Sequence, residues 1–172
     1  MAEFDPEEFF VADRLEKLRT LRERGVDPYP AAFSPTVSVG EYLERYRDVE
    51  ETADGTSYRL AGRIHRINDL GAIAFVEISD ESGSVQLILD EDTDGYELLD
   101  QLDYIDIIGA TGTPGRSNTG ELSLVAESVS VLSKALAHHH PPSKDDVGDP
   151  YVDRAVKFWW DEVRDPIQTR FE

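Results

Sequence analysis

Two side chains in the middle of the chain have the chemistry to recognise a nucleobase. Phe75 lies in an alternating stretch in which Ala74 and Val76 have the opposite phase, so its ring points away from the predicted core. Gln86 has the same outward phase in the next such stretch. An aromatic ring can stack on a base while an amide bonds its Watson–Crick edge, which suits single-stranded RNA. The alternative is that Phe75 packs under an N-terminal helix and Gln86 is solvated.

Three arginines and a histidine precede this pair. Arg59, Arg63 and His65 share one outward phase in the preceding stretch, and Arg66 follows directly. Such groups commonly contact the phosphates of a bound strand. The sequence therefore predicts either a phosphate-contacting edge or a solvated one beside the aromatic–amide pair.

The remaining chemistry-bearing groups do not form a catalytic or metal site. Three adjacent histidines at 138–140 have diverging side chains, and no histidine lies beyond them, so we predict a polar linker there. The chain has no cysteine, which excludes a disulfide framework and a thiolate metal site. The sequence contains no Gly-x-x-x-x-Gly-Lys loop, Gly-x-Ser-x-Gly elbow or His-Glu-x-x-His pair. We expect no metal, no cofactor and no catalytic residue.

The elements that must position the aromatic–amide pair are strands. From Tyr58 the hydrophobic period changes from helical to alternating. A tight turn at 80–83 and a short helix beginning at Tyr96 separate the alternating stretches, which predict strands near 58–67, 72–79, 84–89, 105–113 and 121–132. Three strands, a helix and two strands is the order of an OB-fold. We therefore predict a mainly β fold, a five-stranded OB-fold barrel.

Helices flank the predicted barrel on both sides. Residues 5–24 have the apolar spacing and end signals of a helix, and a capping box of Ser38 and Glu41 begins a short second helix. Apolar residues at helical spacing around Trp159 and Trp160 predict a C-terminal helix. The predicted organisation is an N-terminal helical extension over 1–50, an OB-fold domain over 51–136, a linker over 137–148 and a C-terminal helix over 149–172.

Acidic residues dominate the charge of the chain. There are 36 Asp and Glu against 17 Lys and Arg, giving a net charge of −19. Because phosphate binding normally needs Lys and Arg, this balance indicates either a partner other than nucleic acid or a protein that works at high salt. The lysine-poor acidic composition is similar to that of proteins from halophilic archaea. No stretch approaches a membrane span and the N-terminus lacks the basic region of a signal peptide, so we expect a soluble cytoplasmic protein.

Six short motifs follow one another in a fixed order. They are Gly-Val-Asp-Pro-Tyr-Pro at 25–30, Ala-Gly-Arg-Ile at 61–64, Leu-Gly at 70–71, Gly-Ser-Val-Gln at 83–86, Thr-Gly-Glu-Leu-Ser at 119–123 and Leu-Ser-Lys-Ala-Leu at 132–136. Over about the first 136 residues this order resembles the anticodon-binding domain of class II lysyl-tRNA synthetases. The related aspartyl and asparaginyl enzymes share the barrel motif, whereas the first and the last two motifs are more specific to the lysyl enzymes.

The resemblance implies anticodon recognition by named residues. It implies that Phe75 stacks on a base, that Gln86 reads the central U and that Glu121 approaches a neighbouring anticodon base. A solvated carboxylate at the start of a strand is the alternative for Glu121.

The resemblance is incomplete on the phosphate-facing side. Arg63, His65 and Arg66 are present, but Asn68 stands where the family usually carries an arginine that touches the anticodon loop. This substitution implies reduced positive charge and lower affinity.

The predicted function is a tRNA anticodon-binding module. The ATP-gripping motifs of the family have no counterpart in these 172 residues, so we expect that the chain does not aminoacylate by itself. Its expected partners are tRNA and a catalytic synthetase. Two alternatives stay open, a generic single-stranded nucleic-acid-binding protein and a protein-interaction module whose Trp159 and Trp160 bury into a synthetase.

Overall fold

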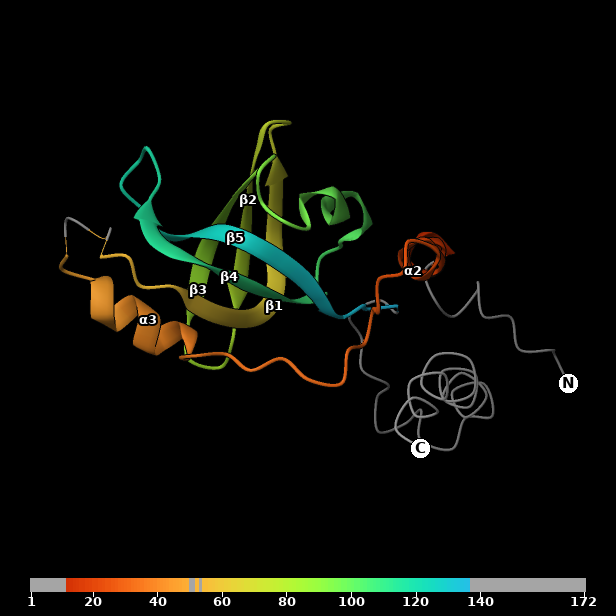
Figure 1. Cartoon of the computed structure of the whole chain (residues 1–172), viewed down its shortest axis with the longest axis horizontal. Helices are drawn as coiled ribbons and strands as arrows, with labels where there is room; N and C mark the ends of the chain where they lie inside the picture. Colours follow the sequence, from red (N-terminus) through yellow and green to blue (C-terminus); the bar gives the residue numbers. More distant parts are fainter. Residues whose placement is uncertain (1–11, 50–51, 53, 137–172) are drawn as a thin grey trace, which may run out of the picture.

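Five strands close into one barrel in the computed structural model, which describes residues 12–49, 52 and 54–136 (Figure 1). The strands are β1 (Tyr58–Asp69), β2 (Ile73–Ser79), β3 (Ser84–Asp90), β4 (Ile107–Arg116) and β5 (Leu122–Ser133). Their order around the barrel is β1-β2-β3-β5-β4, and the pairing is antiparallel except between β3 and β5. The predicted OB-fold barrel is confirmed.

The strands differ from their predicted ranges mainly near the turns. β1 continues two residues further than expected, and β4 runs from Ile107 to Arg116 instead of over 105–113. The predicted 137–148 linker and 149–172 helix lie outside the described residues, as does the beginning of the predicted N-terminal helix. The domain boundaries at 50 and 136 stay predictions.

The barrel core is filled by the inward side chains of all five strands. They alternate with outward residues, as the sequence pattern predicts. The side chains with no exposed surface are Leu60, Ile64, Ala74, Val76, Ile78, Leu87, Leu89, Ile108 and Leu124.

A β-bulge at His65 changes the phase of β1. The β1–β2 ladder passes from Ile64 directly to Arg66, which leaves His65 without a partner in β2. Ile67 packs against the core although it lies only three residues after Ile64. Arg66 and Asn68 therefore face outward. Strict alternation from Ile64 would instead have turned these two residues inward and Ile67 outward.

The helix α3 (Val39–Tyr46) packs against β3 near one end of the barrel. The Ser38 hydroxyl accepts the N–H of Glu41 at 3.2 Å, and the Glu41 carboxylate accepts the N–H of Ser38 at 2.9 Å, so the predicted capping box is confirmed. Hydrogen bonds from Ser38 lower the pKa of the Glu41 carboxyl. Asp80 in the β2–β3 turn accepts the first N–H of the helix at 2.9 Å. These bonds fix α3 on the barrel.

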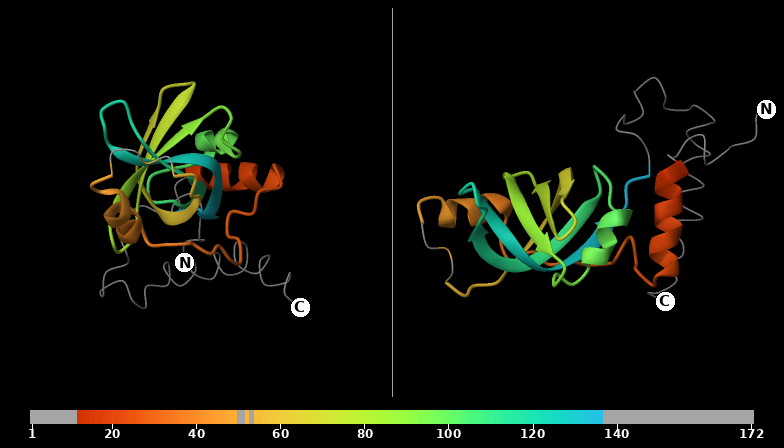
Figure 2. Two further views of the ribbon diagram at one scale, coloured as in Figure 1. Left: turned by 60° about the vertical axis from the view of Figure 1, so that its left-hand side comes forward. Right: turned by 90° about the horizontal axis from the view of Figure 1, so that it is seen from above.

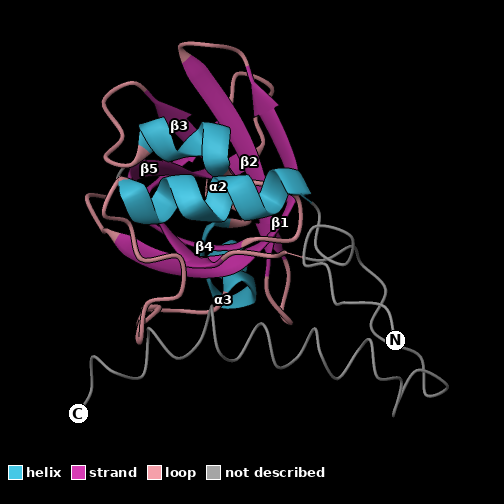
Figure 3. Cartoon of the chain, turned by 90° about the vertical axis from the view of Figure 1, so that its right-hand side faces the viewer, coloured by secondary structure: helices cyan, strands magenta, loops and turns pink. Residues whose placement is uncertain are grey.

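The helix α2 (Ala12–Glu23) lies at the other end, beside the 3-10 helix η1 (Tyr96–Gln101) (Figures 2 and 3). Its leucines at 15, 18 and 21 form a buried stripe, as their spacing predicts. Gly25, with φ of 77°, ends the helix in the left-handed conformation. None of the helices described is both long and apolar enough to cross a membrane.

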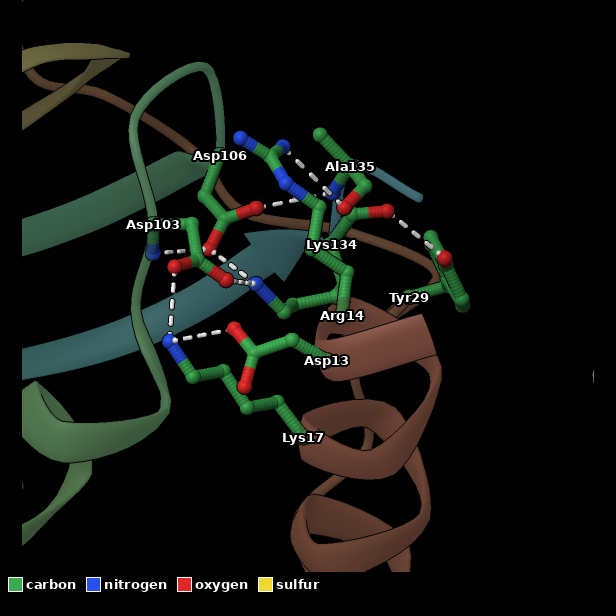
Figure 4. A network of polar contacts seen from close by, with 8 residues as sticks. All are labelled: Asp13, Arg14, Lys17, Tyr29, Asp103, Asp106, Lys134 and Ala135. Atoms are coloured by element: carbon green, nitrogen blue, oxygen red, sulfur yellow. Dashed lines mark hydrogen bonds and ion pairs between the residues drawn. The ribbon is translucent and has the colours of Figure 1, made fainter. Parts of the chain in front are cut away.

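A buried ion cluster fastens α2 and the end of β5 to the turn before β4 (Figure 4). The fully buried Lys134 ammonium lies 2.6 Å from the Asp103 carboxylate and 2.8 Å from that of Asp106. Lys17 of α2 lies 2.7 Å from Asp103. Burial alone would raise the pKa of Asp103, but the hydrogen bonds and charges of Lys134 and Lys17 outweigh burial and hold this pKa below its ordinary value. The cluster thus joins three separate segments.

Candidate nucleic-acid interface

An open pocket of about 280 Å³ lies on the outward face of β1, β2 and β3, beside the β4–β5 loop. The strands contribute its floor and the loop contributes one wall. The lining residues are Arg66, Asn68, Phe75, Glu77, Gln86, Ser117, Asn118, Thr119 and Glu121. The pocket therefore brings together Phe75, Gln86, Glu121, Arg66 and Asn68, which the sequence analysis selected separately.

Phe75 and Gln86 are diagonal neighbours on this face. Phe75 lies between Asn68 of β1 and Ile88 of β3, whereas Gln86 lies opposite Glu77, one outward row away. Such diagonal pairs remain within reach of aromatic and long side chains. The Phe75 ring is half-buried and lines the pocket, and it does not lie beneath α2, which packs against η1.

The start of β5 orients the amide of Gln86. The buried Ser123 hydroxyl donates to Gln86 Oε1 at 3.0 Å, and Gln86 Nε2 donates to Glu121 Oε2 at 3.3 Å. Because an ionised carboxylate only accepts hydrogen bonds, the NH₂ end of the amide must face Glu121. One N–H and one oxygen lone pair of the amide remain for a ligand.

The loop that forms the pocket wall is fastened to the C-terminal end of α3. Arg116 donates to the carbonyl of Gly120 at 3.0 Å, and to the carbonyls of Tyr46 and Val49 at 3.1 and 2.9 Å. The Ser117 N–H donates to the carbonyl of Glu121 at 2.9 Å, which closes the hairpin. Arg116 was not predicted, because no pattern distinguishes it from an ordinary strand residue, and Ser123 was noted only as the last residue of the 119–123 motif.

Arg63 and His65 line a second hollow in the next row of the same strands. Arg63 pairs with Ser79 in the β1–β2 ladder, and the His65 imidazole is hydrogen-bonded to the Ser79 hydroxyl. Arg59 lies elsewhere, with its guanidinium 4.5 Å from the centre of the Phe33 ring. The predicted basic group is thus divided, and only Arg66 lies in the pocket of Phe75.

The pocket has the groups to hold a flat polar ring. Phe75 offers a face for stacking, and Gln86 offers an adjacent donor and acceptor. Arg66 has no ion pair among the described residues, so its guanidinium is available for a phosphate. Glu77 and Glu121 make the pocket unsuitable for a dense anionic ligand. Within the described segments there is no cluster of three metal-ligating side chains, and histidines 138–140 lie outside those segments.

Residues 58–132 match a family described as OB-fold nucleic acid binding domain. The chain is 40% identical over 136 residues to the lysine–tRNA ligase of Dehalococcoides mccartyi, which covers 76% of this chain and 27% of that protein. It is 38% identical over 169 residues to the lysine–tRNA ligase of a Roseiflexus species, and the match covers 91% of this chain and 33% of that protein. It is 35% identical over 157 residues to the lysylphosphatidylglycerol biosynthesis bifunctional protein LysX of Rhodococcus jostii. That match covers 85% of this chain and 13% of that protein. The chain spans a third or less of the length of each of these relatives.

Proposed function

From the premise that residues 58–132 belong to the OB-fold nucleic acid binding domain family, we propose that the protein binds a tRNA anticodon loop in the pocket of Phe75 and Gln86. These residues form an anticodon-binding domain similar to that of lysine–tRNA ligases. The observation that carries this proposal is the meeting of a half-buried ring, an oriented amide and a carboxylate in one pocket. An acidic protein can still bind RNA in this way, because stacking depends little on phosphate contacts.

The proposed ligand of Gln86 is the central U of the anticodon. A uracil presents its N3–H as a donor between two carbonyl acceptors, so it complements the remaining lone pair and N–H of the oriented amide. A cytosine presents an acceptor at N3 and would need the amide to turn around. Glu121 opposes that rotation, because its carboxylate only accepts hydrogen bonds and so needs the NH₂ end of the amide. Discrimination between U and C thus follows from the orientation of Gln86.

The phosphate contact of this pocket is assigned to Arg66. Asn68 occupies the outward position beside Phe75 and can contribute hydrogen bonds but no charge.

In its proposed setting the domain acts together with a catalytic synthetase, with tRNA as the shared substrate. Pyrophosphate exchange with ATP and lysine by the purified chain tests the prediction that these 172 residues do not form an adenylate by themselves. Lysine-dependent exchange would contradict that prediction.

The test of the pocket compares two variants on two RNAs. Phe75→Ala should weaken binding of an anticodon stem-loop by about 1–3 kcal/mol, because one stacked base is lost. Gln86→Ala should weaken binding of a stem-loop with a central U but change little for a central C, because the amide contact is lost while the ring remains. Fluorescence anisotropy on both stem-loops, for the wild type and the two variants, gives the six affinities.

The matched control is Phe33→Ala, which removes an aromatic ring in the segment between α2 and α3, beside Arg59. Its RNA affinity should equal that of the wild type, and circular dichroism checks that every variant is folded. Two folded pocket variants that bind as the wild type does would remove this face from the RNA site. Equal affinity for unstructured oligonucleotides of the same length would favour a generic single-strand binder.

A further inference from the structure

An exposed aromatic side chain lies next to the second hollow, outside the proposed anticodon pocket. Tyr104, in the turn between η1 and β4, is 50% exposed. Its ring centre lies 6.2 Å from that of His65, at an interplanar angle of 74°. The His65 imidazole is held by the Ser79 hydroxyl, so Tyr104 borders the hollow of Arg63 and His65.

The turn that carries Tyr104 is held rigidly. Ile105 has φ of 83°, the single non-glycine residue with positive φ in the described part of the chain, and a β-branched residue adopts this conformation only where its surroundings impose it. The Ile105 N–H donates to the carbonyl of Ile64 at 2.9 Å. The flanking Asp103 and Asp106 are both bonded to the buried Lys134 (Figure 4). A ring presented by so fixed a turn can stack on a ligand with little loss of conformational entropy.

Two arginines of β1, Arg66 and Arg63, lie between the anticodon pocket and Tyr104, beside the carboxylates of Glu77, Asp80 and Glu81. Phe75, Glu77 and Ser79 succeed one another on the outward face of β2, and Phe75 and Ser79 are about 13 Å apart along the strand. Arg66 lies beside Glu77, and Arg63 lies beside Ser79. In a chain with 36 acidic residues, positions 55–68 contain none. The arginines of this segment can contact the phosphates of a bound strand.

We propose that Tyr104 is a second nucleobase-stacking site, which receives another base of the same RNA after the strand leaves the anticodon pocket along β1. Arg63 contacts the phosphate that precedes this base. This inference rests on the proposed anticodon binding and adds a second contact to it. RNA is chosen as the occupant because Arg66 and Arg63 can contact successive phosphates between two aromatic side chains, in a chain that otherwise carries a net charge of −19.

The test separates the two sites by the length of the RNA. The full chain is titrated with an anticodon stem-loop and with the trinucleotide UUU, which has only one nucleotide beyond its central U and so should not reach Tyr104 when that U occupies the pocket of Phe75. Tyr104→Ala should weaken stem-loop binding by about 5- to 100-fold, as expected for the loss of one stacked base, and leave trinucleotide binding unchanged. Tyr104→Phe should retain stem-loop affinity and Tyr104→Leu should not, because stacking requires the ring. Phe75→Ala should weaken the binding of both RNAs.

Arg63→Gln provides an independent measurement. It should lower the slope of log affinity against log salt for the stem-loop by about 0.7, the loss of one single-strand phosphate contact. Arg24→Gln is the matched control, because Arg24 is an exposed arginine at the end of α2 whose partner is Asp100; it should leave the slope unchanged.

The outcomes distinguish the inference from the function on which it rests. If Phe75→Ala weakens stem-loop binding while Tyr104→Ala binds as the wild type does, the second site is wrong and the anticodon pocket stands. If the wild type binds no stem-loop, both are wrong. If Tyr104→Ala weakens the binding of the trinucleotide and of the stem-loop equally, the substitution has distorted the fold. That result would also overturn the proposal that Tyr104 forms a separate site.

Discussion

A glutamine can distinguish bases only if its amide keeps one orientation. In this protein Gln86 is held by Ser123 on its oxygen and by Glu121 on its nitrogen. Ser123 could serve either orientation, since a hydroxyl both donates and accepts, whereas the carboxylate of Glu121 accepts only. Glu121 therefore decides the orientation, and its proposed role includes positioning Gln86 as well as facing a neighbouring base.

The orienting role of Glu121 predicts a loss of selectivity for Glu121→Gln. The amide introduced at position 121 can accept or donate, so Gln86 becomes free to turn and to bond either U or C. We expect the preference for a central U over a central C to fall by about 1 kcal/mol, the scale of one hydrogen bond, mainly through stronger binding of C. Anisotropy titrations of both stem-loops measure it. An unchanged U to C ratio in the folded variant would show that Glu121 does not orient the amide.

At the residue scale, alternation was sufficient to predict that Phe75 and Gln86 share the outward face. It was not sufficient for Arg66 and Asn68, because a bulge moves one residue out of the ladder and reverses the phase after it. A signal was present in the three-residue spacing of Ile64 and Ile67, since both can be buried in one strand only if it bulges between them.

At the scale of elements, the motifs at 25–30 and 132–136 meet where α2 joins the barrel. The Tyr29 hydroxyl donates to the carbonyl of Lys134 at 2.7 Å, and the Lys134 N–H donates to the carbonyl of Pro28 at 3.2 Å. Burial raises the pKa of the Tyr29 hydroxyl, so it remains a donor in this contact. Two motifs that are distant in sequence therefore form one joint.

The joint depends on the buried ammonium of Lys134. Lys134→Met should destabilise the fold by about 3–5 kcal/mol, because the Asp103 and Asp106 carboxylates lose their buried partner. Lys17→Met is the control, since Lys17 is partly exposed and its removal should cost about 1 kcal/mol or less. Urea denaturation followed by circular dichroism gives both free energies of unfolding. Equal, small costs for the two variants would contradict a structural role for the buried cluster.

The turn before β4 gives a second prediction at this scale. At Ile105, with φ of 83°, glycine should be more stable than alanine by about 1 kcal/mol, because a Cβ atom is strained at positive φ. The order should reverse at Ile73, an exposed strand residue, where glycine costs backbone entropy. Thermal unfolding of the four variants tests the pair of inequalities. A more stable alanine variant at both positions would show that residue 105 does not adopt this conformation in solution.

The elements were more predictable than the contacts between them. Periodicity and turn residues were enough for the strands and for the Ser38 capping box, which are local features. The burial of Lys134 could not be predicted, because a lysine in an acidic chain normally lies in solvent and its partners come from a turn about 30 residues away. The strain at Ile105 was hidden for the same reason, since tertiary contacts impose it against the local preference of the residue.

At the scale of the whole molecule, the acidic surface means that added salt should change fold stability and RNA affinity in opposite directions. A net charge of −19 repels itself, and about 1 M salt shortens the Debye length to about 3 Å, which removes most of that repulsion. Phosphate contacts weaken with salt, but Arg63 and Arg66 limit the charged contacts of this face to about two, so the slope of log affinity against log salt should be about −1.4.

We therefore expect KCl to stabilise the fold while it weakens RNA binding less steeply than in a protein that makes six or more phosphate contacts. Between 0.1 and 2 M KCl the melting temperature should rise by about 4–8 °C, equivalent to 1–2 kcal/mol for a domain of this size. The matched control replaces four exposed carboxylates with amides, at Glu16, Glu44, Asp48 and Glu127. This variant should melt higher than the wild type at 0.1 M KCl and gain less from added salt, because it has less repulsion to screen. Differential scanning calorimetry of both proteins in a KCl series measures the two slopes. Parallel slopes would mean that salt acts through something other than surface charge, and the prediction that this protein works at high salt would lose its physical basis.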